Sequence, residues 1–399
     1  MITPQEQDPA GAPPTLSAAQ LAVLGKLLGS SETVNTCIQA LTRVLDASKV
    51  KTIVLPLPDG GTVTFAQTRP AFQLEGGFTW RGEVKESGEP AVLMLWQDGS
   101  VTGSFAYLGR VYSVERMGSN LHTVAELRMP PIHAPVRDQQ TAASRTGDGI
   151  VPGKAATAAP TPPPVIAPFA DATRQALEAK AITIDVLLLH TKRVASRYVG
   201  PLSVRLPFVI ETVNQTFENS GVGNVKLRLV LTELLDFDEQ GADHFDLLYK
   251  MVDGVGPFKD VRKLRDAKRA DIVGLIVDNP EGCGLSTRVG AEADEAYFLV
   301  HHACAAVSYS VAHEVGHILG ARHDRLTDSS ETPFPYAHGY VHDNAWRTMM
   351  AYNSPCGGCP RIPYWSNPRV LYKGVPTGTI AHDNARVILE QAERVANFR

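Results

Sequence analysis

The fold class and the chemistry of this chain are decided by residues 313–324, which read HEVGHILGARHD. On a helix, His313 and His317 lie four positions apart and therefore share one face. Two neutral imidazoles on one face can bind the same zinc ion. Glu314 lies beside them, close enough to take a proton from a water molecule without becoming a ligand. The segment therefore predicts a helix that carries a metal site.

A catalytic zinc ion needs a third protein ligand and an open fourth position. Helix periodicity alone would direct His323 away from the ion. Gly320 resolves this, because glycine adopts positive φ, ends the helix and lets the chain turn back. We therefore predict one catalytic Zn²⁺ held by His313, His317 and His323, with Glu314 as general base.

The pattern HExxHxxGxxH followed by a methionine turn resembles the metzincin zinc proteases. Residues 348–352, TMMAY, resemble that turn, with Met350 as an apolar floor under the histidines. The resemblance implies a mixed α/β or α+β catalytic domain: a twisted, mostly parallel sheet with one antiparallel edge strand, and the active-site helix. Tyr352 is similar to the tyrosine that some metzincins place beside the zinc to stabilise an oxyanion, and simple packing is its alternative role. Asp324 is expected to brace the site, unless it only closes a turn.

Within the metzincins, two flanking stretches are similar to the reprolysin-like bacterial peptidyl-Asp metalloendopeptidases. They are residues 289–302, VGAEADEAYFLVHH, and residues 359–368, CPRIPYWSNP. This similarity implies protein or peptide substrates, which bind extended along an edge strand near residues 284–289 and are cut on the amino side of Asp or Glu. Such a pocket needs a cation, and Arg361 and Arg288 are the candidates, with a solvated surface position as the alternative for each.

Two other functions compete with this one. The chain could be a secreted metalloprotease of broad specificity, or a catalytically silent zinc-containing module for binding or toxicity. Glu314 argues against the silent module, because a structural zinc site has no use for a base beside an open coordination position.

The chain divides into three regions. Residues 1–138 predict a helical and then β-rich domain, residues 139–175 are an Ala/Pro-rich linker, and residues 176–399 form the protease domain. Apolar spacing from Leu16 to Val50 suits two helices after a loose tail at residues 1–15. Short β-prone runs with turns between them then predict an antiparallel meander that ends near Leu127.

The β-rich domain and its protease-sensitive linker suggest a prosegment that acts as an intramolecular inhibitor of a latent precursor. Cys37, His133 and Asp138 are candidates for covering the zinc ion, and steric blocking of the groove is the alternative.

Five cysteines bear on the cellular compartment. Cys283 and Cys304 bracket two expected strands and can staple them. Cys356 and Cys359 form a CxxC, which is typical of a tight disulfide, a redox pair or half of a second zinc site, and the short loop favours the disulfide. Two disulfides favour a secreted or periplasmic protein over five idle thiols, although no signal peptide is visible.

The composition sets outer limits. The 399 residues include 44% hydrophobic residues, enough to build cores, and carry a net charge of −4, which does not suggest a nucleic-acid-binding face. No apolar run approaches the ~18 residues that span a membrane. We therefore expect neither nucleic acid nor membrane as a partner.

Overall fold

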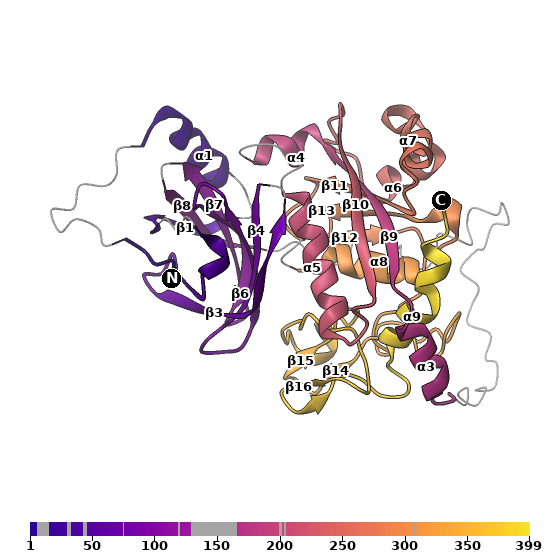
Figure 1. Cartoon of the computed structure of the whole chain (residues 1–399). Helices are drawn as coiled ribbons and strands as arrows, with labels where there is room; N and C mark the ends of the chain where they lie inside the picture. The colour runs from indigo at the N-terminus through magenta and orange to yellow at the C-terminus, as the bar shows by residue number, and fades with distance from the viewer. Residues whose placement is uncertain are drawn as a thin grey trace. The chain divides into compact units, whose positions relative to one another are not determined.

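The computed structural model describes residues 1–5, 16–29, 33–42, 46–74, 76–118, 120–128, 166–198, 202, 205–305 and 308–399. They fall into two compact units (Figure 1). The first comprises the described residues up to Pro130 and Ala195–Glu211, and the second comprises the rest. His133, Asp138 and most of the expected linker lie outside the described residues.

The first unit is built on a curled antiparallel sheet whose described strands run in the order β1-β8-β7-β6-β5-β4-β3-β2. The strands are β1 (Thr33–Ala40), β2 (Thr52–Pro56), β3 (Thr62–Leu74), β4 (Gly77–Val84), β5 (Pro90–Trp96), β6 (Val101–Tyr107), β7 (Arg110–Gly118) and β8 (Leu121–Leu127). Side chains that alternate along these strands pack inward around Trp80, Phe65 and Phe105. The predicted meander is confirmed as β2 to β8.

Two expectations for this unit are wrong. Only the first predicted helix exists, α1 (Ala18–Leu28), which begins at a capping box on Ser17. The second is replaced by β1, because the open edge of β8 offers a ladder of backbone partners to Thr33–Ala40. Cys37 therefore lies on a strand, half-buried against the core, and burial raises the pKa of its thiol.

The first five residues are not a loose tail. Ile2 forms a bridge with Ile53 at one edge of the sheet, and Pro4 forms a bridge with Leu41 next to the other edge. Ile2 is buried in the core. The N-terminal segment thus links the two edges of the curled sheet.

The second unit contains a five-stranded sheet in the order β10-β9-β11-β13-β12. Its strands are β9 (Ile182–Thr191), β10 (Val225–Leu235), β11 (Ile272–Val277), β12 (Gly284–Ser286) and β13 (Tyr297–His301). The pairs β10–β9, β9–β11 and β11–β13 are parallel, and the short edge strand β12 pairs with β13 in the antiparallel sense. All six residues of β11 are buried, as befits a strand covered on both faces.

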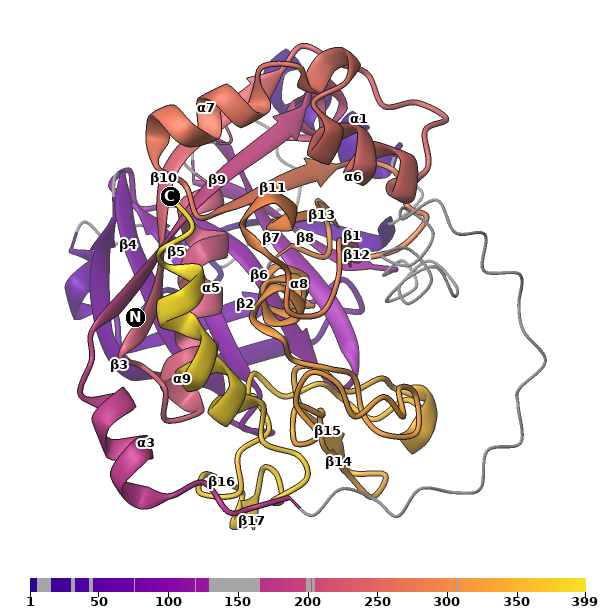
Figure 2. The same ribbon diagram turned by 90° about the vertical axis from the view of Figure 1, so that its right-hand side faces the viewer.

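Helices cover both faces of this sheet (Figure 2). On one face, α6 (His244–Asp253) and α7 (Val261–Lys268) bury Leu187 and Leu275 under Leu248 and Val261. On the other, α8 (Ser310–Leu319) packs against β12 and β13. The remaining elements are α3 (Asp171–Glu178), α4 (Lys192–Arg197), α5 (Leu206–Asn219), α9 (Asn384–Val395) and the two-stranded pairs β14 (Val341–His342) with β15 (Trp346–Arg347) and β16 (Leu371–Tyr372) with β17 (Val375–Pro376). The mixed α+β class is confirmed.

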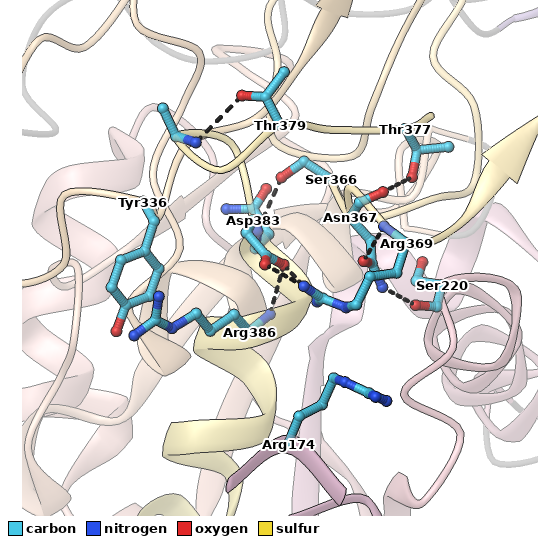
Figure 3. Close-up of polar contacts among 12 residues, drawn as sticks. Arg174, Ser220, Tyr336, Ser366, Asn367, Arg369, Thr377, Thr379, Asp383 and Arg386 are labelled. Atoms are coloured by element: carbon cyan, nitrogen blue, oxygen red, sulfur yellow. Dashed lines mark hydrogen bonds and ion pairs between the residues drawn. The ribbon is translucent and has the colours of Figure 1, made fainter. Parts of the chain in front are cut away.

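A polar network surrounds the start of the C-terminal helix α9 (Figure 3). Asp383 caps α9 by accepting from the backbone N–H of Arg386 at 3.0 Å. The same carboxylate binds both terminal nitrogens of Arg369, at 2.8 and 3.0 Å. Arg369 and Arg386 also lie over the ring of Phe169. The first described residues after position 165 are therefore held against α9.

Among the described residues, no helix is both long enough and apolar enough to cross a membrane.

Candidate active site

Helix α8 carries the first two histidines, and each of its ten residues is buried. It ends at Gly320, whose φ of +107° is left-handed, as the sequence predicts. A Cβ at Gly320 would lie 2.9 Å from the ring of Phe334, so glycine is needed for space as well as for conformation. Beyond this turn, the chain brings His323 back towards the helix.

The three histidines converge. Nε2 of His323 lies 3.2 Å from Nε2 of His313 and 3.0 Å from Nε2 of His317. Nδ1 of His313 donates to the carbonyl of Met349 at 3.1 Å, and Nδ1 of His317 donates to the carbonyl of Ala321 at 2.9 Å. Because a carbonyl only accepts, both rings carry their proton on Nδ1 and direct the Nε2 lone pair to the common centre.

This donor set fits a metal ion. Burial lowers the pKa of His317 to about 4, which keeps that imidazole neutral. Lone pairs separated by 3.0–3.2 Å repel one another unless a cation lies between them. Three neutral imidazoles are also a usual ligand set for zinc.

Glu314 lies between the histidine-bearing face of α8 and the edge strand. Its side chain is 1% exposed. A Cβ built on Gly284 of β12 would lie 2.5 Å from Oε1 of Glu314. The missing side chain at position 284 is therefore what leaves room for the carboxylate.

The methionine turn packs under the helix. A Cβ on Gly316 would lie 2.8 Å from Sδ of Met350 and 2.6 Å from the ring of Trp365. Met350 is fully buried and lies directly below the turn that separates His313 from His317. Close packing of sulfur and indole against this glycine holds α8 in place.

Tyr352 and Asp324 lie around the third histidine. The rings of His323 and Tyr352 meet edge to face, with 4.5 Å between centroids. Oδ2 of Asp324 accepts from the backbone N–H of Tyr352 at 2.9 Å and from the hydroxyl of Thr327 at 2.9 Å. Asp324 thus joins the segment that carries His323 to the methionine turn.

Arg361 lies beside the catalytic centre. Its Nη1 donates to the carbonyl of Ser308 at 2.8 Å, whereas its buried Nε and Nη2 make no hydrogen bond among the described residues. Burial lowers the pKa of Arg361 to about 10, and the charges of Tyr352 and Glu314 offset part of this effect. The side chain therefore has donors available next to Glu314.

Sequence reasoning missed a second arginine, Arg347. Its backbone is bridged to that of Arg361, and its side chain donates to the carbonyls of Cys359 and Ala351 at 3.1 and 2.5 Å. Burial, and then the charge of Arg361, lower the pKa of Arg347 to about 8. The charge of Asp324 offsets part of this effect on Arg347. The sequence does contain a signal for Arg347, because this basic residue directly precedes the methionine turn.

Arg288 has a different environment. It lies beyond the end of β12, which is only three residues long, rather than on the strand itself. Its side chain is 40% exposed, and Nη1 lies 3.2 Å from Oε2 of Glu295. Its charge is therefore already compensated.

Both expected disulfides are present. Cys283–Cys304 joins the start of β12 to the turn that follows β13, with 5.4 Å between the Cα atoms. Cys356–Cys359 closes a short loop between Tyr352 and Arg361, with 5.5 Å between the Cα atoms. The two disulfides thus brace the segments on either side of the histidine cluster.

Comparisons with known proteins agree with this geometry. The family model Reprolysin_5, metallo-peptidase family M12, matches residues 180–366. A peptidyl-Asp metalloendopeptidase of Xanthomonas campestris pv. campestris is 32% identical over 393 residues, which cover 94% of this chain and 88% of the relative. A peptidyl-Asp metalloendopeptidase of Stenotrophomonas maltophilia is 32% identical over 88% of this chain and 80% of the relative. One from Pseudomonas fragi is 47% identical over 24% of this chain and 62% of the relative.

Proposed function

Because the chain belongs to metallo-peptidase family M12 and is a metalloendopeptidase, we propose that it is a zinc enzyme which cuts proteins before Asp or Glu. The observation that carries the proposal is the convergence of three histidines beside a buried glutamate, with Nε2 of His323 at 3.2 and 3.0 Å from those of His313 and His317. Its relatives carry the name peptidyl-Asp metalloendopeptidase.

His313, His317 and His323 are the proposed ligands of Zn²⁺. When bound there, the ion supplies a Lewis acid that polarises the scissile carbonyl and acidifies a water molecule. Glu314 takes the proton of the attacking water and returns it to the leaving amine. Support for this role comes from its position next to His313 and from the confined space that Gly284 leaves around its carboxylate.

Three further residues have supporting roles. Met350 packs under α8 at Gly316, and Asp324 links the segment that carries His323 to the methionine turn. Tyr352 directs its phenol towards the developing oxyanion, and its ring contact with His323 supports this assignment. Substrate pairs in extended form with the outer side of β12, which is the edge strand of the five-stranded sheet among the described residues.

The acidic specificity is assigned to Arg361 rather than to Arg288. A buried guanidinium with two donors available, close to Glu314, is suited to a carboxylate on the first residue after the cut. Arg347 adds a second positive charge. Burial, and then repulsion from Arg361, lower the pKa of Arg347, and a carboxylate of the substrate would reduce this repulsion. Arg288 already has Glu295.

Peptide cleavage tests this assignment. In matched peptides with Asp or Asn after the scissile bond, Arg361→Leu should lower kcat/KM for the Asp peptide on the order of 100-fold and change the Asn peptide little. Arg288→Leu is the control and should change neither. An Asp preference that survives Arg361→Leu would refute the assignment.

Mapping of cleavage sites separates the broader alternatives. A denatured protein of known sequence is digested, and the new N-termini are identified by mass spectrometry with and without a chelator. Chelator-sensitive cuts before Asp or Glu are expected. Cuts scattered over many residues would favour a broad-specificity protease.

We also propose that the enzyme is made as a latent precursor. Residues 1–138 act as an intramolecular inhibitor, residues 139–175 as the cleavable linker and residues 176–399 as the protease. The separate core of the β-rich unit supports this division. Two disulfides support secretion or export to the periplasm. A specific protease site inserted within residues 139–165 should raise activity when it is cut, and unchanged activity would exclude inhibition by the prosegment.

A further inference from the structure

A second group of metal-binding side chains lies at the carboxyl ends of β11 and β13. Asp278 directly follows β11, His301 ends β13, and His302 is the next residue. The parallel register pairs Val277 with His301, so these ends meet at one edge of the sheet. One ligand atom from each of the three side chains lies within 4.8 Å of the other two.

The backbone fixes these positions. The N–H of His302 donates to the carbonyl of Val277 at 2.9 Å, and the N–H of His301 donates to the carbonyl of Cys283 at 3.0 Å. The three side chains also contact one another. Nε2 of His302 lies 3.0 Å from Oδ1 of Asp278, and the two histidine rings lie 4.5 Å apart. The N–H of Ala303 lies 3.3 Å from Nδ1 of His301.

The three side chains are almost entirely buried, unlike most charged side chains, which lie on the protein surface. His301 is 0% exposed and Asp278 is 5% exposed. The side chain of His302 is 9% exposed. Two imidazoles and one carboxylate in a buried, pre-formed arrangement are a donor set that suits zinc.

The surrounding charges also favour a cation. Glu239 is 1% exposed, and its Oε1 accepts from the N–H of Asp278 and the hydroxyl of Thr191, both at 2.8 Å. Its Oε2 is buried without a hydrogen bond among the described residues. Arg193, whose side chain is 35% exposed, places its Nε 3.5 Å from Oδ2 of Asp278. Two buried carboxylates thus lie at this edge of the sheet, and burial lowers the pKa of His244, which disfavours a positive charge on that ring.

We propose that Asp278, His301 and His302 bind a second divalent metal ion, with Zn²⁺ as the ion that fits this donor set. The ion is structural and has no part in the reaction. It ties the ends of β11 and β13 to the turn that leads into α8, the same turn that the Cys283–Cys304 disulfide anchors. The proposal is independent of the acidic specificity.

Metal content of the purified full-length protein tests the proposal. After exhaustive dialysis against metal-free buffer, elemental analysis by mass spectrometry should give two zinc ions per chain. His302→Ala should lower this to one, as should Asp278→Asn. His190→Ala is a matched control, because it also truncates a buried histidine near the end of a neighbouring strand, and it should keep two.

A second measurement separates this site from the catalytic one. The double variant His313→Ala/His317→Ala should retain one ion per chain, which is lost when His302→Ala is added. One ion in the wild type and none in the double variant would overturn the second site while leaving the catalytic metal intact. The wild-type stoichiometry alone decides the question if a variant does not fold.

Discussion

Gly284 is the position where the smallest change should have a large effect on catalysis. In Gly284→Ala, the new Cβ would lie 2.5 Å from Oε1 of Glu314 and 3.0 Å from Cδ. Ordinary contact begins at 3.4 Å, so the carboxylate must withdraw by about 0.9 Å, the difference between 3.4 and 2.5 Å. The buried helix α8 cannot follow that movement, because all its residues are packed.

A misplacement of about 1 Å in a catalytic group costs on the order of 100-fold in rate. We therefore expect Gly284→Ala to lower kcat about 100-fold, with little change in KM. Metal content and the melting temperature should stay close to those of the wild type, because alanine is compatible with a strand at this position. Initial rates on a peptide with Asp after the scissile bond measure the first pair of values, and elemental analysis and thermal melting measure the second.

The control for this prediction is the Glu314→Gln background. If Gly284→Ala acts through the position of the carboxylate, it should cause no further loss once that carboxylate has been replaced. A kcat within threefold of the wild type at full metal content would refute the reasoning. So would a loss that adds in full to that of Glu314→Gln.

Three further outcomes are expected. Chelation should abolish activity and lower the melting temperature of the full chain, and Zn²⁺ should restore both; activity that survives complete metal removal would contradict the metal site. Burial lowers the pKa of His122 to about 4, below its unfolded value of 6.5. As the pH falls, His122 therefore binds a proton in the unfolded chain before it does so in the folded chain. The β-rich unit should therefore be fully stabilised above about pH 6.5 and lose about 3 kcal/mol as the pH falls to 4, and His122→Gln should reduce this loss in hydrogen-exchange measurements. Replacing Cys283 and Cys304 by serine should cost about 3 kcal/mol in unfolding free energy, against about 2 for Cys356 and Cys359, because the sequence separations are 21 and 3; equal losses in denaturant melts would contradict the loop-closure argument.

The histidine cluster was predictable because its geometry is local. The spacing of His313 and His317 fixes a common helix face, and Gly320 fixes where the helix ends. The left-handed φ at Gly320 is the backbone conformation that the third ligand requires. The strands of the meander were predictable for a similar reason, since turn residues and β-prone runs alternate at short range.

The elements that were missed depend on distant partners. The apolar residues of Thr33–Ala40 are compatible with a helix in isolation, and only the free edge of β8 makes a strand the better solution. Residues 1–5 carry no strand signal, yet the two edges of a curled sheet give Ile2 and Pro4 backbone partners. Tertiary pairing, which leaves no local trace in the sequence, decided both.

The proposed specificity pocket combines the two kinds of information. Its position next to the methionine turn can be read from the sequence, which pointed to Arg361. The charge of the pocket cannot be read from the sequence, because Arg347 becomes a neighbour of Arg361 only when the backbone at position 347 bridges that at position 361. Two guanidinium groups buried side by side repel each other. A carboxylate of the substrate that binds next to them would reduce this repulsion. On this view, preference for an acidic residue arises from the pairing of two segments and not from either arginine alone.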